Sequence, residues 1–211
     1  MQTNHQTPAL SLRGVSKHFG GVRAVNNVTT DIADGERRLF IGTNGAGKTT
    51  LFNLIAGDLP VSAGSIQLFG KDVTNMPTRK RVKLGMRRTY QTSALFDGLT
   101  VRQNFYLALL GEKKTGSHLN MLVHHRGNPG FEEKIQETAK TVGLEAKLDE
   151  DVSALSHGER RQLEFGLAII TDPQMLLFDE PAAGLSAEER KMMLQMIQSL
   201  SRDITIVMIE H

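Results

Sequence analysis

One eight-residue stretch constrains what this chain can fold into. It reads Gly42-Thr43-Asn44-Gly45-Ala46-Gly47-Lys48-Thr49, and it stands between the apolar Leu39-Phe40-Ile41 and a segment with helical apolar spacing. Glycines let a backbone turn tightly and aim successive N–H groups at phosphate oxygens, and the N-terminal end of a following helix adds positive charge. The pattern therefore predicts a strand, a phosphate-binding loop and a helix, and it indicates a nucleoside triphosphate ligand.

The polar residues of this loop have distinct expected roles. Lys48 supplies a mobile positive charge for the β- and γ-phosphates, and the Thr49 hydroxyl can ligate Mg²⁺, which takes few protein ligands. Leu51, Leu54 and Ile55 predict a helix that stops at Gly57. The expected nucleotide-binding residues here are Gly42, Thr43, Asn44, Gly45, Ala46, Gly47, Lys48, Thr49 and Thr50.

Two carboxylates follow an apolar run near the end of the chain. Met175–Phe178 is continuously apolar, as expected for a strand buried on both faces, and Asp179-Glu180 comes directly after it. Ligands of open α/β sheets bind at the C-terminal ends of strands. A solvated loop start is the alternative, but with the phosphate loop upstream we expect Asp179 to hold the Mg²⁺ shell and Glu180 to act on the attacking water.

The remaining sequence predicts a strand-rich start, a helical middle and an α/β end. Ser186 and Glu189 form a capping-box pattern at the start of the last helix, which places Met193, Ile197 and Leu200 on one face. A polar loop at 111–130 separates two middle helices. The expected strands are short antiparallel ones within 8–35, Ser65–Phe69 and Ile204–Ile209, and the expected helices include Val101–Leu110, Phe131–Leu144 and Arg160–Ile170.

Composition narrows the class of protein. The chain has 211 residues, 39% of them apolar, and no cysteine, which excludes disulfides and thiolate metal sites. A net charge of +2 does not point to nucleic acid, and we expect none as a partner. The apolar runs are too short to cross a bilayer, so a membrane function would need other chains.

Leu155-Ser156-His157-Gly158-Glu159 resembles the LSGGQ signature of the ABC (ATP-binding cassette) family. The order of phosphate loop, Gln91, signature, acidic strand end and His211 matches that family over nearly the whole chain. The resemblance implies an α/β fold: a P-loop NTPase (RecA-like) core with an N-terminal antiparallel β subdomain and an inserted α-helical subdomain. We expect the core to comprise residues 1–89 and 167–211, and the helical signature subdomain 90–166.

The resemblance also assigns roles. It places Phe19 on the adenine ring, although the residue alone could be a core aromatic, and it places Ser156 and Gly158 on the γ-phosphate held by a second copy. Gln91 is implied to touch Mg²⁺ and face a membrane partner, and His211 to touch the γ-phosphate. The implied cofactors are ATP and Mg²⁺. The catalytic set is then Lys48, Gln91, Glu180 and His211, and the metal set is Thr49, Gln91 and Asp179.

Some residues depart from the family pattern or lie outside its assigned roles. Thr43 stands where many members have proline, and Ser186 where many have aspartate in the D-loop. His157 and Glu159 replace the second glycine and the glutamine of the signature. Among residues with no assigned role, we expect Tyr90 and Phe96 to be packing residues, and Arg87 and Arg88 to form a solvated or partner-facing stretch.

The finer resemblance is to branched-chain amino-acid importer ATPases, carried by Glu36-Arg37-Arg38, Arg88–Gln91 and Glu180–Leu185. Urea- and lipopolysaccharide-type transporter ATPases are close alternatives. Implied partners are a second ABC ATPase, in a homodimer or heterodimer, membrane permease subunits and a substrate-binding protein. The implied location is cytoplasmic, on the inner face of the cell membrane. Cassettes of this type continue beyond the histidine, so we expect the natural chain to extend past His211.

Three other classes share single features with this chain. A small-molecule kinase or GTPase would have the phosphate loop without Leu155–Glu159, and no Asn-Lys-x-Asp guanine motif is present. A soluble, non-transport ABC ATPase of DNA repair or translation would carry long coiled-coil insertions or a second cassette. A binding module without turnover would not need Glu180.

Overall fold

The computed structural model describes residues 7–89, 95–112 and 129–210. It divides into two compact units. The sheet unit comprises the chain up to residue 91, Pro173–Ala183 and the segment from Leu200 on; the helical unit comprises 92–172 and Gly184–Ser199. The domain division that we expect from the sequence, with boundaries after residues 89 and 166, stays a prediction.

The first sheet of the sheet unit is antiparallel. Its strands are β1 (Leu10–Phe19), β2 (Val22–Ile32), β4 (Ala63–Leu68) and β5 (Lys71–Asp72), in the order β2-β1-β4-β5. The expected antiparallel strands are confirmed, but their expected shortness is wrong, because β1 has 10 residues and β2 has 11. Register shifts along the β1–β2 pair interrupt the alternation of side chains, so one long hairpin has the pattern of several short strands.

The second sheet is parallel and carries the motifs. Its strands are β3 (Arg37–Ile41), β6 (Met86–Thr89), β7 (Met175–Asp179) and β8 (Thr205–Glu210), in the order β3-β8-β7-β6. All five residues of β7 are buried, and β7 is a central strand that pairs with β8 on one side and β6 on the other. The expected strands before the phosphate loop, before the acidic pair and at the chain end are therefore confirmed.

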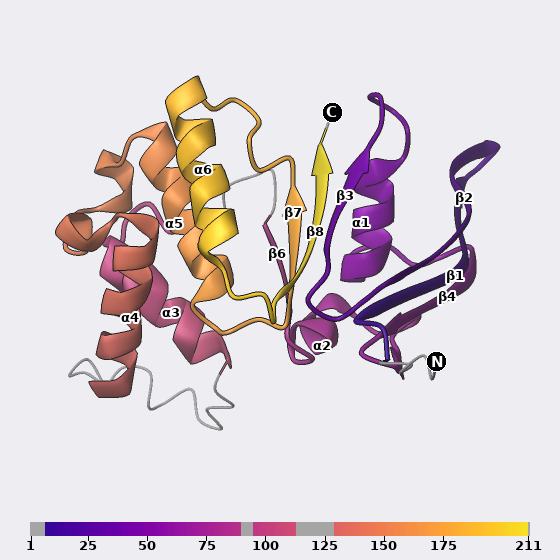
Figure 1. The fold of residues 1–211 in the computed structure, drawn as a ribbon, viewed down its shortest axis with the longest axis horizontal. Coiled ribbons are helices and arrows are strands. Elements are labelled where there is room, and N and C mark those ends of the chain that lie inside the picture. The colour runs from indigo at the N-terminus through magenta and orange to yellow at the C-terminus, as the bar shows by residue number, and fades with distance from the viewer. Residues whose placement is uncertain (1–6, 90–94, 113–128, 211) are drawn as a thin grey trace, which may run out of the picture. The chain divides into compact units, whose positions relative to one another are not determined.

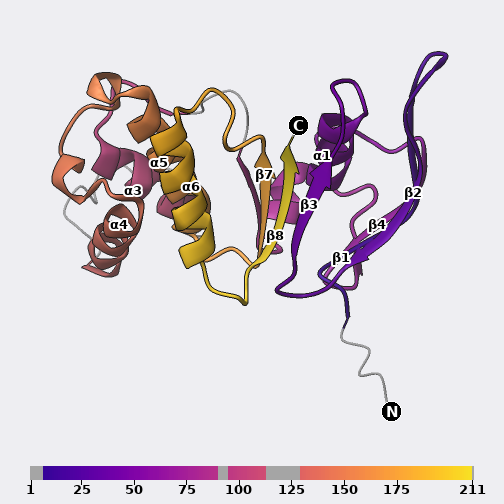
Figure 2. The same cartoon turned by 45° about the horizontal axis from the view of Figure 1, so that its top comes forward.

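Helix α1 (Lys48–Ala56) lies between the two sheets in Figure 1 and Figure 2. It ends at Gly57, whose left-handed φ of 85° lets its N–H donate to the carbonyls of Asn53 and Leu54, as expected. One core forms around this helix. It contains Leu51, Phe52, Leu54 and Ile55 of α1, Leu10, Leu12, Ile66 and Leu68 of the antiparallel sheet, and Met175, Leu177, Val207 and Ile209 of the parallel sheet.

The helical unit contains α3 (Val101–Glu112), α4 (Pro129–Val142), α5 (His157–Ile169) and α6 (Ala187–Ser199), with 3₁₀ turns at Glu145–Lys147 and Val152–Ala154. All four were expected. Of the expected polar loop at 111–130, residues 113–128 lie outside the described part of the chain, and the flanking residues belong to α3 and α4. No helix among the described residues is long and apolar enough to cross a membrane.

The interpretation of Phe96 as a packing residue is wrong, because its exposed fraction is 57%. The buried side chain at this turn is Asn104. Its side-chain amide accepts from the N–H of Phe96 and donates to the carbonyls of Phe96 and Thr100, so a polar side chain, not the aromatic ring, secures this turn.

Among the residues that the structure describes, Arg81 is the largest fully buried side chain, and it lies on α2 (Thr78–Val82). Its guanidinium donates to the carbonyls of Leu54 and Ile55, in the last turn of α1, and to those of Met76 and Thr74. The last carbonyls of a helix have no intrahelical donor, and here the Arg81 guanidinium is their donor. Burial lowers the pKa of Arg81 from its ordinary value, while Asp58 and Asp72 oppose that shift.

Arg81→Ala should therefore be strongly destabilising, because several carbonyls would lose their donor inside the protein. We expect the free energy of unfolding to fall by at least about 3 kcal/mol, which lowers Tm by roughly 6–12 °C for a chain of this size. The measurement is thermal denaturation followed by circular dichroism. Arg79→Ala, an exposed change in the same helix, is the matched control. Equal melting of the two variants would contradict this account of α1.

Candidate active site

The motifs of the sheet unit meet at one edge of the parallel sheet. Because β3, β8 and β7 are parallel, their C-terminal ends lie at the same edge. The phosphate loop follows β3, Asp179 ends β7 and Glu180 comes next. Strand β8 separates the two motif-bearing strands, so one strand width lies between the loop and the acidic pair.

The phosphate loop adopts a conformation that needs glycine at two positions. Gly45 and Gly47 have φ of 80° and 84°, in the left-handed region. A Cβ on Gly47 would also come within 2.0 Å of the Ala24 carbonyl oxygen on β2. A side chain at position 47 would therefore push the loop off the antiparallel sheet. From Gly47, α1 begins at once, with the N–H of Leu51 donating to the Gly47 carbonyl at 2.8 Å.

The loop and the first turn of α1 concentrate positive potential. The ammonium of Lys48 donates to the carbonyl oxygens of Gly42, at 2.5 Å, and Thr43, at 3.1 Å, which hold it against the loop. No acidic residue lies in the first turn of α1. Thr49, which follows Lys48 in that turn, is exposed. A lysine ammonium and a helix N-terminus suit a phosphate chain. These residues therefore fit the triphosphate expected from the sequence.

Asp179 presents two unlike carboxylate oxygens. The residue is 4% exposed, and its Oδ2 accepts a hydrogen bond of 2.5 Å from Arg88. Its Oδ1 is buried and has no hydrogen-bond partner in the described part of the chain. A buried carboxylate oxygen without a donor is costly, and carboxylate oxygens are ligands that Mg²⁺ prefers. Asp179 and the Thr49 hydroxyl therefore fit the expected magnesium ion.

The prediction that Arg88 lies on a solvated or partner-facing stretch is wrong. Its side chain is 4% exposed, and it is paired with Asp179 and with Asp58. Arg88 belongs to β6, which pairs with the buried strand β7. No sequence pattern links residues 88 and 179, because only strand pairing brings them together.

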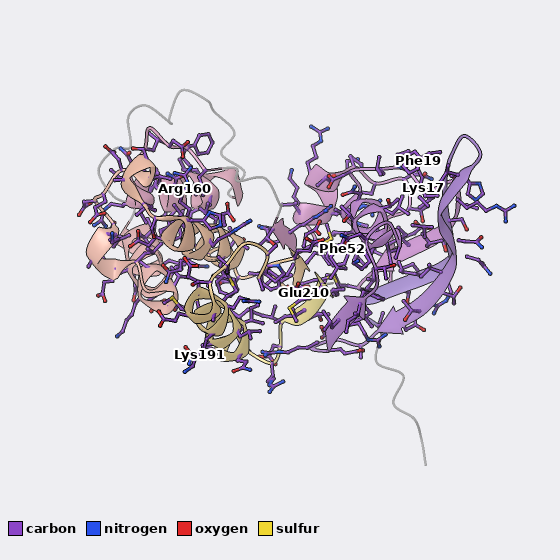
Figure 3. The ribbon with its side chains drawn as sticks, turned by 90° about the horizontal axis from the view of Figure 1, so that it is seen from above. Lys17, Phe19, Phe52, Arg160, Lys191 and Glu210 are labelled. Atoms are coloured by element: carbon purple, nitrogen blue, oxygen red, sulfur yellow. The ribbon has the colours of Figure 1, made fainter. Side chains whose placement is uncertain are left out.

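Glu180 follows the strand in an unusual backbone conformation. Its φ of 51° is left-handed, which costs a non-glycine residue about 1–2 kcal/mol. The conformation is held on both sides: the Glu180 N–H donates to the Ile209 carbonyl at 3.1 Å, and its carbonyl accepts from Ala183 at 3.0 Å. In Figure 3 Glu210 lies at the end of β8, where its carboxylate accepts from the Ala182 N–H at 3.3 Å.

Phe19 lies at the β1–β2 turn and is 48% exposed, so it is not a core aromatic. The ammonium of Lys17 lies 5.2 Å from the centre of its ring, and Figure 3 labels both residues. The same ammonium donates to the Pro60 carbonyl at 2.7 Å. The stacking of this ring on adenine stays a prediction.

In the helical unit, the signature begins α5 with a capping box. The Ser156 hydroxyl accepts from the Glu159 N–H, and the Glu159 carboxylate accepts from the Ser156 N–H. Lys147 lies 2.9 Å from that carboxylate and, with the Ser156 hydrogen bond, lowers the pKa of Glu159. The acid in place of the usual glutamine is therefore paired with a cation. The Ser156-x-x-Glu159 pattern could have predicted this cap from the sequence.

Gly158 lies where the caps of two helices meet. The capping box predicted for α6 is confirmed, since Ser186 and Glu189 exchange the same pair of hydrogen bonds. The Glu189 carboxylate lies 2.3 Å from where a Cβ on Gly158 would stand. Because Ser186 holds this carboxylate in place, a side chain at position 158 would disturb both helix starts.

Gln91 and His211 lie outside the described residues, as does Tyr90. The described chain comes close to both motif positions, since β6 ends at Thr89 and β8 at Glu210. The roles expected for Gln91 and His211 stay predictions.

A phosphate loop and an acidic strand end on one parallel sheet, with a separate helical unit that carries a signature loop, are the features of ATP-hydrolysing cassettes. The family model described as "ABC transporter" matches residues 25–183. This chain belongs to that family. It is an ATP-binding ATPase subunit with a P-loop NTPase core, and the fold class expected from the sequence is confirmed.

The relatives are ATP-binding subunits of transporters. LivG of Salmonella typhimurium, named a high-affinity branched-chain amino acid transport ATP-binding protein, is 34% identical over 209 residues, which cover 97% of this chain and 82% of LivG. BraF of Pseudomonas aeruginosa carries the same description and is 32% identical over 213 residues, 97% of this chain and 82% of BraF. A crystal structure of an ABC transporter cassette in its ADP conformation, 30% identical, matches with a TM-score of 0.81 over 97% of this chain and 81% of that chain.

The exposed ring of Phe19 leads to a prediction about adenine. Base–aromatic stacking contributes about 1–3 kcal/mol, so Phe19→Ala should weaken ATP binding by about 5- to 150-fold. Phe19→Tyr keeps a stacking face and should bind nearly normally. A fluorescent ATP analogue gives the affinities by titration. Unchanged affinity in the alanine variant would show that the ring does not contact the base.

Proposed function

We propose that this chain binds Mg²⁺·ATP and hydrolyses it to drive the import of branched-chain or related amino acids through membrane partner subunits. The observation that carries the proposal is the sheet order β3-β8-β7, which brings the phosphate loop and the Asp179-Glu180 pair to one edge. A nucleotide held by the loop would present its terminal phosphate towards the acidic pair.

The proposed chemistry is phosphoryl transfer to water, which depends on positioning and charge neutralisation. The loop N–H groups and Lys48 would hold the β- and γ-phosphates, and Thr49 and Asp179 would hold Mg²⁺. When bound, the metal would neutralise charge on the phosphate oxygens. Glu180 would accept a proton from the attacking water, and the hydrogen bonds on both sides of its backbone keep its position defined.

The proposed assembly is a head-to-tail dimer in which each signature loop completes the other copy's site. Ser156 and Gly158 stand at the start of α5, where N–H groups and the helix dipole favour an anion. Pairing Glu159 with Lys147 keeps the added acid from opposing a phosphate there. Such an interface is isologous, with the same patch on both copies. The second copy would be this chain or a related ATPase.

The transport role is proposed from the relatives. LivG and BraF are named for branched-chain amino acid transport. By analogy, this chain would sit at the cytoplasmic face of the cell membrane, contact permease subunits near Gln91 and work with a substrate-binding protein. Transport assays in a strain that lacks its own system, with leucine and urea as competing substrates, test the substrate class.

Lys48→Ala tests the phosphate loop. The lysine side chain donates to carbonyl oxygens of its own loop and is not part of the apolar core, so its loss should abolish ATP hydrolysis and weaken ATP binding with little change in Tm. Released phosphate, nucleotide titration and thermal melting are the three measurements. Lys71→Ala, an exposed change on β5, is the control. Hydrolysis at the parent rate in Lys48→Ala would overturn the assignment.

Glu180→Gln tests the base and the dimer together. The amide keeps the size of the side chain but cannot accept the water's proton, so ATP should bind and close the dimer without being hydrolysed. Light scattering after size-exclusion chromatography, with and without ATP, should show an ATP-dependent dimer that the parent forms only briefly. Normal turnover in this variant would exclude Glu180 as the base.

Adding Ser156→Arg to Glu180→Gln should abolish the ATP-dependent dimer, because a long cation cannot fit where a small hydroxyl meets the phosphate. The single variant Ser156→Arg, melted alone, controls for the lost helix cap, which costs about 1 kcal/mol. A dimer that survives in the double variant would exclude the head-to-tail arrangement.

A further inference from the structure

Arg88 holds a buried position that the proposed chemistry does not use. Its Nη2 donates to Asp179 Oδ2 at 2.5 Å, and its Nη1 donates to Asn53 Oδ1 at 2.6 Å and to Asp58 Oδ2 at 3.1 Å. Its guanidinium carbon lies 5.8 Å from the centre of the buried Phe52 ring. One side chain on β6 therefore joins the end of β7 to helix α1.

The contact with Asn53 connects Arg88 to the helix that carries Thr49, a second proposed metal ligand. Asn53 is four residues after Thr49 on α1, so the two side chains lie on the same helix face, one turn apart. The Arg88 guanidinium thus joins α1, which carries Thr49, to β7, which carries Asp179. Any shift of α1 against β7 would have to break one of these hydrogen bonds.

Arg88 also distinguishes the two oxygens of Asp179. By occupying Oδ2 it fixes the rotation of the carboxylate and leaves Oδ1, which is buried and has no hydrogen-bond partner among the described residues. The guanidinium does not cancel the negative charge of the cluster, because it is shared between Asp179 and Asp58. One acidic oxygen therefore remains available for a cation.

We propose that Arg88 is a positioning residue for the magnesium ion: it orients Asp179 Oδ1 and fixes the distance between β7 and the Thr49 turn of α1. The inference deepens the proposed function and rests on it. Lysine would not serve, because a point charge on a flexible stem cannot bond Asn53 and Asp179 in one plane as a guanidinium does.

The test is the Mg²⁺ dependence of ATP binding, measured by titrating a fluorescent ATP analogue in EDTA and at increasing Mg²⁺. Groups that orient a metal ligand typically change metal affinity by about 10- to 100-fold when removed. Arg88→Lys should raise the Mg²⁺ concentration for half-maximal effect by that factor and leave affinity in EDTA within about twofold. Asn53→Ala removes the hydrogen-bond acceptor on α1 and keeps the arginine. It should raise the Mg²⁺ concentration for half-maximal effect by a smaller factor.

Arg87→Lys is the matched control, because the guanidinium of Arg87 donates to the backbone carbonyls of Val82 and Met86. It should leave the Mg²⁺ dependence unchanged. A double-mutant cycle of Arg88→Lys with Asp179→Asn should be strongly non-additive if the two residues act on one ion.

The outcomes separate this inference from the proposed function. If Asp179→Asn leaves the Mg²⁺ dependence unchanged, the metal assignment in the proposed function fails. If Asp179→Asn shifts the Mg²⁺ dependence but Arg88→Lys and Asn53→Ala leave it unchanged, only the role of Arg88 is overturned. A lower Tm with unchanged Mg²⁺ dependence would reduce Arg88 to a structural residue, and tighter Mg²⁺ binding in Arg88→Lys would show that it competes with the ion. If Arg88→Lys does not fold, Asn53→Ala decides.

Discussion

The parallel pairing of β7 with β8 and β6 is the constraint on which the rest of the sheet unit depends. This central strand is paired on both sides, and every one of its residues is buried, including Asp179 at its end. A buried carboxylate has to be compensated, and the same pairing supplies the compensation by carrying Arg88 in on β6. Because all these strands run in one direction, the phosphate loop after β3 arrives at the same edge.

Backbone conformation defines the site as much as side chains do. The phosphate loop turns through left-handed glycines, and at Gly47 there is no room for a side chain against β2. Glu180 takes a left-handed φ without being a glycine, and neighbouring backbone hydrogen bonds hold it there. A strained residue held from both sides at the end of a motif strand is an arrangement found at functional sites.

Each unit pairs its buried or added acid with a nearby cation. In the sheet unit, Arg88 lies between Asp179 and Asp58 and leaves Asp179 Oδ1 without a hydrogen-bond partner among the residues that the structure describes. In the helical unit, Lys147 pairs with Glu159, the acid by which the signature departs from its usual form. That departure is therefore accommodated by a nearby cation, and the start of α5 keeps the small residues Ser156 and Gly158.

The sequence by itself determined the local elements and the motif set. Glycine spacing predicted the phosphate loop, the apolar run predicted β7 and its acidic end, and Ser186 with Glu189 predicted a helix cap, because each signal lies within a few residues. The tertiary structure decided what depends on distant pairing. Arg88, expected to lie on a solvated or partner-facing stretch, lies against Asp179, and Phe96, expected to pack, is exposed while the Asn104 side chain holds its backbone. Strand order and buried ion pairs join residues far apart in the chain, and no local periodicity encodes them.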